Sequence, residues 1–86
     1  MTHTITTDQA ANILAIATLR NLTAGNGGFP LSEEMKAQNR AEIARIEKEV
    51  PAALLRAAAT AAAARDEATS RIAATQNWLN TQTITD

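Results

Sequence analysis

Apolar side chains and alanines recur every three or four residues along most of the second half of this chain. The span from Ser32 to about Asn80 contains no glycine and a single proline, Pro51, and most of its residues favour helix. At 1.5 Å per residue, an unbroken helix of this span would be roughly 70 Å long. The spacing predicts a coiled-coil-like seam on that helix. The seam comprises Ile43, Ile46, Val50, Leu54, Ala57, Ala61, Ala64, Ala68, Ile72 and Leu79, with Trp78 beside its last position.

Pro51 lies within the seam without shifting its phase. A proline in a helix interior removes one backbone hydrogen bond and costs about 3 kcal/mol, so the long helix should be kinked or broken there. Because no run of turn residues flanks Pro51, the sequence favours a kink. Pro51 then serves as a first-turn residue of the segment that follows.

A shorter helix is predicted from about Asp8 to Thr23. Thr6 and Gln9 have the spacing of a capping box at its start. Its large aliphatic residues lie on more than one side, whereas a surface helix normally shows one apolar stripe. We therefore expect this helix to be buried on two sides.

Glycines and an asparagine separate the two helical spans, in the sequence Gly-Asn-Gly-Gly-Phe-Pro from position 25 to 30. Such residues end a helix and permit positive φ. Ser32 then provides a strong N-cap for the second helix. The threonine-rich ends, residues 1–7 and 81–86, are expected to be flexible tails of a single domain that covers residues 1–86.

These elements predict an all-α fold that packs as a helical bundle. The first helix covers only roughly 24 Å of the long one, at 1.5 Å per residue, and so cannot bury the whole seam. Much of the 45% apolar content is alanine, which suits closely approaching helix backbones. The long segment must therefore either fold back on itself near Pro51 or bury the seam against another copy of the chain. We expect the second: a homo-oligomer, a dimer or larger, with the seam as the self-interface.

Composition excludes several classes of function. A formal net charge of −1 argues against non-specific nucleic-acid binding, which needs a basic excess. There is no cysteine, and His3 is the single histidine, so neither a metal site nor any other cofactor is predicted. No base can be assigned to Ser32 or Ser70 for nucleophilic catalysis. No apolar run approaches the ~18 residues of a membrane span. We expect a non-enzymatic protein of the cytoplasm, in a bacterium or an infected host cell.

The first functional hypothesis is a small helical interaction protein that binds and occludes a macromolecular partner, most simply another protein. A small, cysteine-free, alanine-rich and slightly acidic chain is typical of inhibitors and adaptors that bacteria and phages encode. Its contact surface would combine the loop tip with acidic charge that matches a basic partner. The residues are Asn26, Gly27, Gly28, Phe29, Glu33 and Glu34.

Two alternatives stay open. In one, an oligomer sequesters a small, nucleotide-like anion at its subunit junctions, because arginine recognises phosphate and carboxylate with a fork of donors. The candidate residues are Arg20, Arg45, Arg56 and Arg65. In the other, the chain is a structural adaptor within a larger assembly, and its polar ends become ordered only on assembly.

Overall fold

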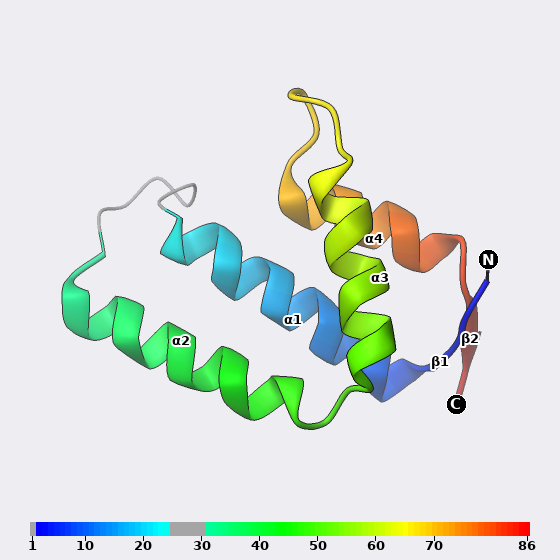
Figure 1. Cartoon of the computed structure of the whole chain (residues 1–86), viewed down its shortest axis with the longest axis horizontal. Coiled ribbons are helices and arrows are strands. Elements are labelled where there is room, and N and C mark those ends of the chain that lie inside the picture. Colours follow the sequence, from blue (N-terminus) through cyan, green and yellow to red (C-terminus); the bar gives the residue numbers. More distant parts are fainter. Residues whose placement is uncertain (1, 25–30) are drawn as a thin grey trace.

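The protein is described here from a computed structural model that covers residues 2–24 and 31–86. The described residues are predominantly helical, and a short two-stranded ladder joins the two ends of the chain (Figure 1). In chain order the elements are β1 (Thr4–Thr6), α1 (Thr7–Thr23), α2 (Glu33–Glu47), α3 (Ala52–Ala63), α4 (Arg71–Asn80) and β2 (Thr83–Thr85). The all-α prediction is therefore confirmed in outline, with the ladder as an addition.

The expected long helix is divided into three. Pro51 does interrupt it, but as a corner and not as a kink: α2 ends at Glu47, and Pro51 is the N-cap of α3. Two backbone hydrogen bonds close the turn, from Glu49 N to Ile46 O (2.9 Å) and a longer one from Val50 N to Glu47 O (3.4 Å). Proline supplies no N–H and crowds the preceding helical turn, so α2 ends just before it.

A second interruption, between α3 and α4, was not predicted. The Asp66 side chain accepts hydrogen bonds from Ala68 N (3.1 Å) and from the Thr69 hydroxyl (2.8 Å). The Ser70 hydroxyl caps α4 by accepting from Ala73 N at 3.1 Å. These short polar side chains offer the backbone an alternative to the helix, which overrides the high helix propensity of the neighbouring alanines. Two positions of the predicted seam, Ala64 and Ala68, are exposed in this region.

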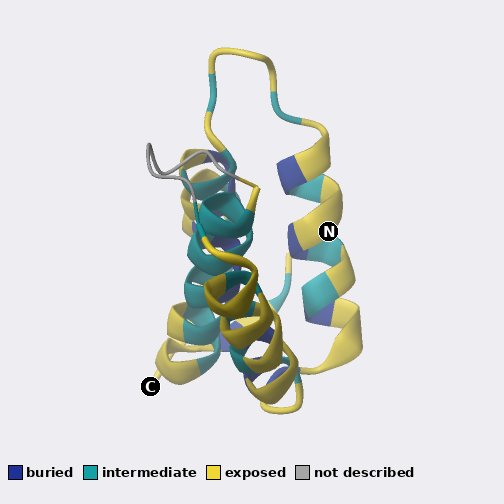
Figure 2. Cartoon of the chain, turned by 90° about the vertical axis from the view of Figure 1, so that its left-hand side faces the viewer, coloured by how far each residue is buried: buried dark blue, intermediate teal, exposed yellow. Residues whose placement is uncertain are grey.

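Helix α1 is the central element. It contacts α2 on one side and α4 on another, while α3 packs on α4. Two core clusters result, and α1 contributes to both: Ile13 packs with Ile5, Val50, Leu54, Ala58 and Leu79, whereas Ile16 packs with Ile43 and Ile46. Buried residues occupy the helix faces that point inward, and exposed residues the outer faces (Figure 2). The prediction that α1 is buried on two sides is confirmed.

The large side chains of the seam are buried within the single chain. The two corners let α2 pack on α1 and α3 pack on α4, so these residues find partners inside the protein. Ile43, Ile46, Val50, Leu54 and Leu79 are all buried, and Ala57, Ala61, Ile72 and Trp78 are half-buried. The seam therefore does not require a second copy of the chain to be buried. Self-association itself stays a prediction, which light scattering over a dilution series tests.

The terminal segments form a parallel ladder and are not tails. Ile5 pairs in register with Ile84, and Thr4 and Thr6 pair with Thr83 and Thr85. Ile5 is completely buried and belongs to the core, which gives the ladder a hydrophobic anchor. The sequence does carry a signal for this pairing: the pattern Thr-x-Thr-Ile-Thr occurs at positions 2–6 and again at 81–85.

His3 is held by the same ladder. Its backbone N donates to Gln82 Oε1 at 2.7 Å, and its carbonyl accepts from Thr83 N at 3.0 Å. The imidazole ring lies 6.1 Å from the ring of Trp78, at an interplanar angle of 50°. Trp78 in turn packs against the main core cluster. Both side chains therefore have structural roles at this end of the protein.

Candidate anion-binding groove

An open groove of about 500 Å³ lies where the end of α1, the face of α2 and the first residue of α4 meet. Three arginines, each from a different helix, line it. Its described walls are Arg20, Thr23, Ala24, Arg40, Ile43, Ala44, Glu47 and Arg71. We call this feature the arginine groove.

Helical spacing explains how these side chains reach one place. Arg20 follows the buried Ile16 by four residues and Ala17 by three, so it extends the inner face of α1. Arg40 precedes the buried Ile43 by three residues and lies on the same side of α2. Arg71 enters as the first residue of α4, directly after its Ser70 cap.

The charges in the groove do not balance. Glu47 is the one carboxylate among its described lining residues, and its Oε1 lies 3.3 Å from the Arg20 Nη2. The Arg20 side chain is 40% exposed and that of Glu47 is 39% exposed, so the pair contributes at most about 1 kcal/mol to the stability of the folded protein. Three guanidinium groups against one carboxylate leave two net positive charges, which favours a dianion.

Arg71 lies in an environment that is unfavourable for its guanidinium group. Within residues 2–24 and 31–86, its Nε is buried and has no hydrogen-bond partner. Its positive charge also stands at the positive end of the α4 dipole, where no acidic residue occupies the first turn. An unsatisfied buried donor costs about 1–3 kcal/mol. An anion bound in the groove would relieve the second of these costs by neutralising the charge at the helix end.

A small apolar cavity adjoins the groove. It has a volume of about 30 Å³ and lies between α1, α3 and α4, with Arg20 and Arg71 in its wall as in that of the groove. The remaining lining residues are Ile13, Ile16, Ala17, Leu55, Ala58, Ala59, Ala62 and Thr75. The two arginines therefore stand between a polar groove and an apolar recess.

A third depression, of about 610 Å³, lies beside the α3–α4 connection. Arg65 and Arg71 line it, but so do Asp66 and Glu67, so its charges balance. Arg65 also donates a hydrogen bond from Nη1 to the Ala62 carbonyl. This surface is therefore a weaker candidate for an anion than the arginine groove.

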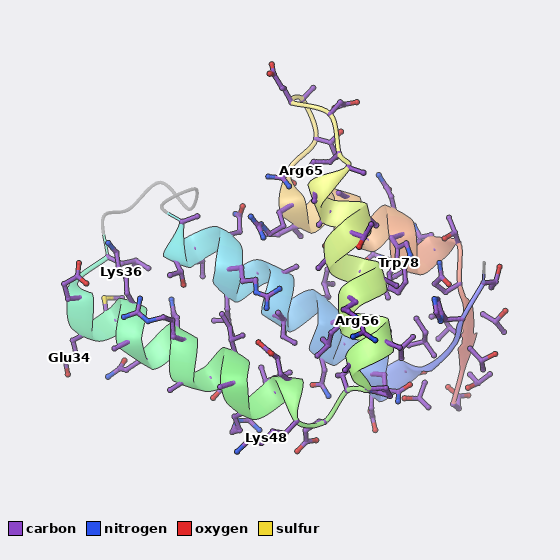
Figure 3. All side chains as sticks on the ribbon, viewed as in Figure 1. Glu34, Lys36, Lys48, Arg56, Arg65 and Trp78 are labelled. Carbon is purple, nitrogen blue, oxygen red and sulfur yellow. The ribbon has the colours of Figure 1, made fainter. Side chains whose placement is uncertain are left out.

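The structure brings together only part of the predicted arginine set. Arg20 lines the groove, and Arg65 lies nearby in the balanced depression. Arg56 is exposed on α3 and lines neither hollow (Figure 3). The sequence analysis missed Arg40 and Arg71. The spacing of Arg40 from Ile43 and the position of Arg71 after the Ser70 cap were signals that could have identified them.

Arg45 is engaged elsewhere. Its guanidinium holds the carboxylate of Glu42 on the same helix, with Nε 3.1 Å from Oε2. This hydrogen bond lowers the pKa of the Glu42 carboxyl below its ordinary value, and it raises the pKa of Arg45. The pair is a local feature of the surface of α2 and lies outside the groove.

The predicted partner-binding surface is described only in part. Asn26, Gly27, Gly28 and Phe29 lie outside the described residues. Glu33 and Glu34 are exposed in the first turn of α2, where negative charge interacts favourably with the helix dipole. Glu34 is labelled in Figure 3. The Glu33 Oε1 also lies 3.5 Å from the Lys36 Nζ. These contacts account for the two glutamates structurally, and neither residue lines the arginine groove.

The described part of the chain shows neither a metal-binding cluster nor a membrane-spanning helix. Its His, Asp and Glu residues do not form a cluster of three or more that could hold a metal ion. None of its helices has the length and apolar character needed to cross a membrane. No protein-family model, curated protein or solved structure matches this chain.

Proposed function

We propose that this protein is a non-enzymatic binding protein that recognises a phosphate group in the arginine groove. The observation that carries the proposal is the convergence of Arg20, Arg40 and Arg71 from three helices on one open groove, whose described lining residues include a single carboxylate. Guanidinium groups bind phosphate through paired, charge-assisted hydrogen bonds. The net charge of the groove suits a phosphate monoester, which carries about −1.5 to −2 near neutral pH.

This proposal keeps the predicted recognition of a small anion by arginines but places the site within one chain. Three arginines already meet within one chain, so the groove needs no subunit junction to assemble it. Occlusion of a macromolecular partner through Glu33 and Glu34 stays a prediction. Local helix electrostatics already account for both residues, so their positions add no support to it.

Titration with inorganic phosphate tests the proposal. Binding is measured by calorimetry and by the midpoint of thermal unfolding. Sodium chloride at matched ionic strength controls for screening. Binding should raise the midpoint of thermal unfolding, because a ligand at 100 times its Kd stabilises the folded state by about 2.7 kcal/mol.

Arg40→Ala is the decisive variant, because Arg40 is exposed and its loss should leave the core intact. A lost charge-assisted hydrogen bond of about 1.5–3 kcal/mol should weaken phosphate binding by about 10- to 100-fold. Arg56→Ala removes an equally exposed arginine from outside the groove and should bind as the parent does. Equal affinities of the two variants, or no phosphate-specific stabilisation of the parent, would refute the proposal.

A further inference from the structure

The apolar cavity beside the groove indicates which chemical group is attached to the bound phosphate. We infer that the ligand is a phosphate monoester with a short alkyl substituent, the phosphate lying in the arginine groove and the alkyl group in the cavity. The inference rests on the proposed function and deepens it. Arg20 and Arg71 line both hollows, so a substituent on a phosphate bound to these two guanidinium groups would start beside the cavity.

The cavity walls favour an apolar occupant. Ile13, Leu55 and Ala58 supply aliphatic surface from α1 and α3. The hydroxyl of Thr75, the one uncharged polar side chain among the described lining residues, already donates to the Arg71 carbonyl at 2.8 Å. Apart from Thr75 and the two guanidinium groups, the described lining residues offer an occupant aliphatic side chains only.

The cavity also sets the size of the substituent. Its volume is about 30 Å³, whereas about 10–15 Å³ of such space accommodates one water-sized group. Two or three carbons can therefore be enclosed, and a longer chain must extend into solvent. This predicts a ligand with an ethyl- or propyl-sized group, in contrast to a long lipid tail.

A homologous series of phosphates tests this size limit. The probes are inorganic phosphate and the methyl, ethyl, n-propyl, n-butyl and n-hexyl monoesters, each titrated by calorimetry at one ionic strength. Each enclosed methylene should increase the affinity about fourfold, equivalent to about 0.8 kcal/mol. The increase should stop after two or three carbons, because further methylenes stay in water.

Ala59→Leu locates the subsite. Ala59 is exposed yet lines the cavity, so the larger side chain should fill the recess from its edge without disturbing the buried core. The variant should bind inorganic phosphate as the parent does and lose the gain from the alkyl group. Ala53→Leu makes the same change at an exposed site of α3 outside the cavity and should retain that gain.

The outcomes separate this inference from the proposed function. If phosphate binds in an Arg40-dependent way but the alkyl series is flat, the alkyl subsite is refuted and the phosphate site stands. A gain that persists unchanged in Ala59→Leu, or that continues through the hexyl ester, also refutes the subsite. If neither phosphate nor any of the esters binds, the proposed function and this inference fail together.

Discussion

Replacing Arg71 with leucine should stabilise the protein while it abolishes phosphate binding. The guanidinium Nε is buried without a partner among the described residues, and its charge stands at the positive end of α4. Leucine has nearly the same helix propensity as arginine, and it can replace the packing of the arginine stem against the apolar cavity. The substitution therefore removes two unfavourable contributions and retains most of the favourable packing.

The expected gain can be worked from these contributions. Removal of an unsatisfied buried donor is worth about 1–3 kcal/mol, and removal of the unfavourable charge–dipole interaction about 0.3–1 kcal/mol. Some loss of packing offsets them, so we expect the free energy of unfolding to rise by about 1 kcal/mol. An unfolding entropy of about 2.1 cal/mol/K per residue gives about 0.18 kcal/mol/K for 86 residues. The midpoint of thermal unfolding should accordingly rise by about 5 °C.

Thermal unfolding with and without phosphate is the assay, and Arg56→Leu is the matched control. The control makes the same change of side chain and charge at an exposed position of α3, so its stability should stay within about 0.5 kcal/mol of the parent. Phosphate should stabilise the parent and the control but not Arg71→Leu. A loss of more than about 1 kcal/mol in Arg71→Leu relative to the control would show that Arg71 is a structural residue, and the reasoning would be refuted.

Two further predictions concern the scaffold. Ile5→Ala should lower the free energy of unfolding by about 2–5 kcal/mol in urea titrations, because Ile5 is completely buried, whereas Ile84→Ala, at its 45% exposed register partner, should cost less than about 1 kcal/mol. Equal losses would contradict the anchoring role of Ile5. By NMR titration the Glu42 carboxyl should show a pKa below its ordinary value, which Arg45→Ala should raise. Because that pKa is lowered in the folded state, the pair stabilises the protein above the unfolded pKa, and this small stabilisation is lost as the pH falls through the folded pKa. An unchanged Glu42 titration in Arg45→Ala would indicate that the pair is open in solution.

The helix starts were predictable from short stretches of sequence. The capping box of Thr6 and Gln9 is present as predicted, with Gln9 N donating to the Thr6 hydroxyl at 3.1 Å. Ser32 likewise caps α2, by accepting from Met35 N at 3.2 Å. Both interactions join residues three positions apart, so the local sequence contains all the partners. The α3–α4 connection was missed because its polar residues compete with a strong alanine signal for helix, and only the folded chain shows which prevails.

The arginine groove was not predictable in the same way. Its three arginines come from positions 20, 40 and 71, and the predicted set included only the first of them. A long helix would have carried Arg40 and Arg71 far apart along one axis. The corner at Pro51 and the turn built on Asp66 bring them to the same groove as Arg20.

The sequence by itself determined the helical composition of the protein, its capped helix starts and the interruption at Pro51. These features depend on propensities and hydrogen bonds that span a few residues. Tertiary structure alone decided the direction of the chain at each corner, the parallel pairing of β1 with β2 and the meeting of the arginines. The Ile5–Ile84 pair joins opposite ends of the chain, and such contacts form only when burial of the shared core offsets the entropy of closing the intervening loop.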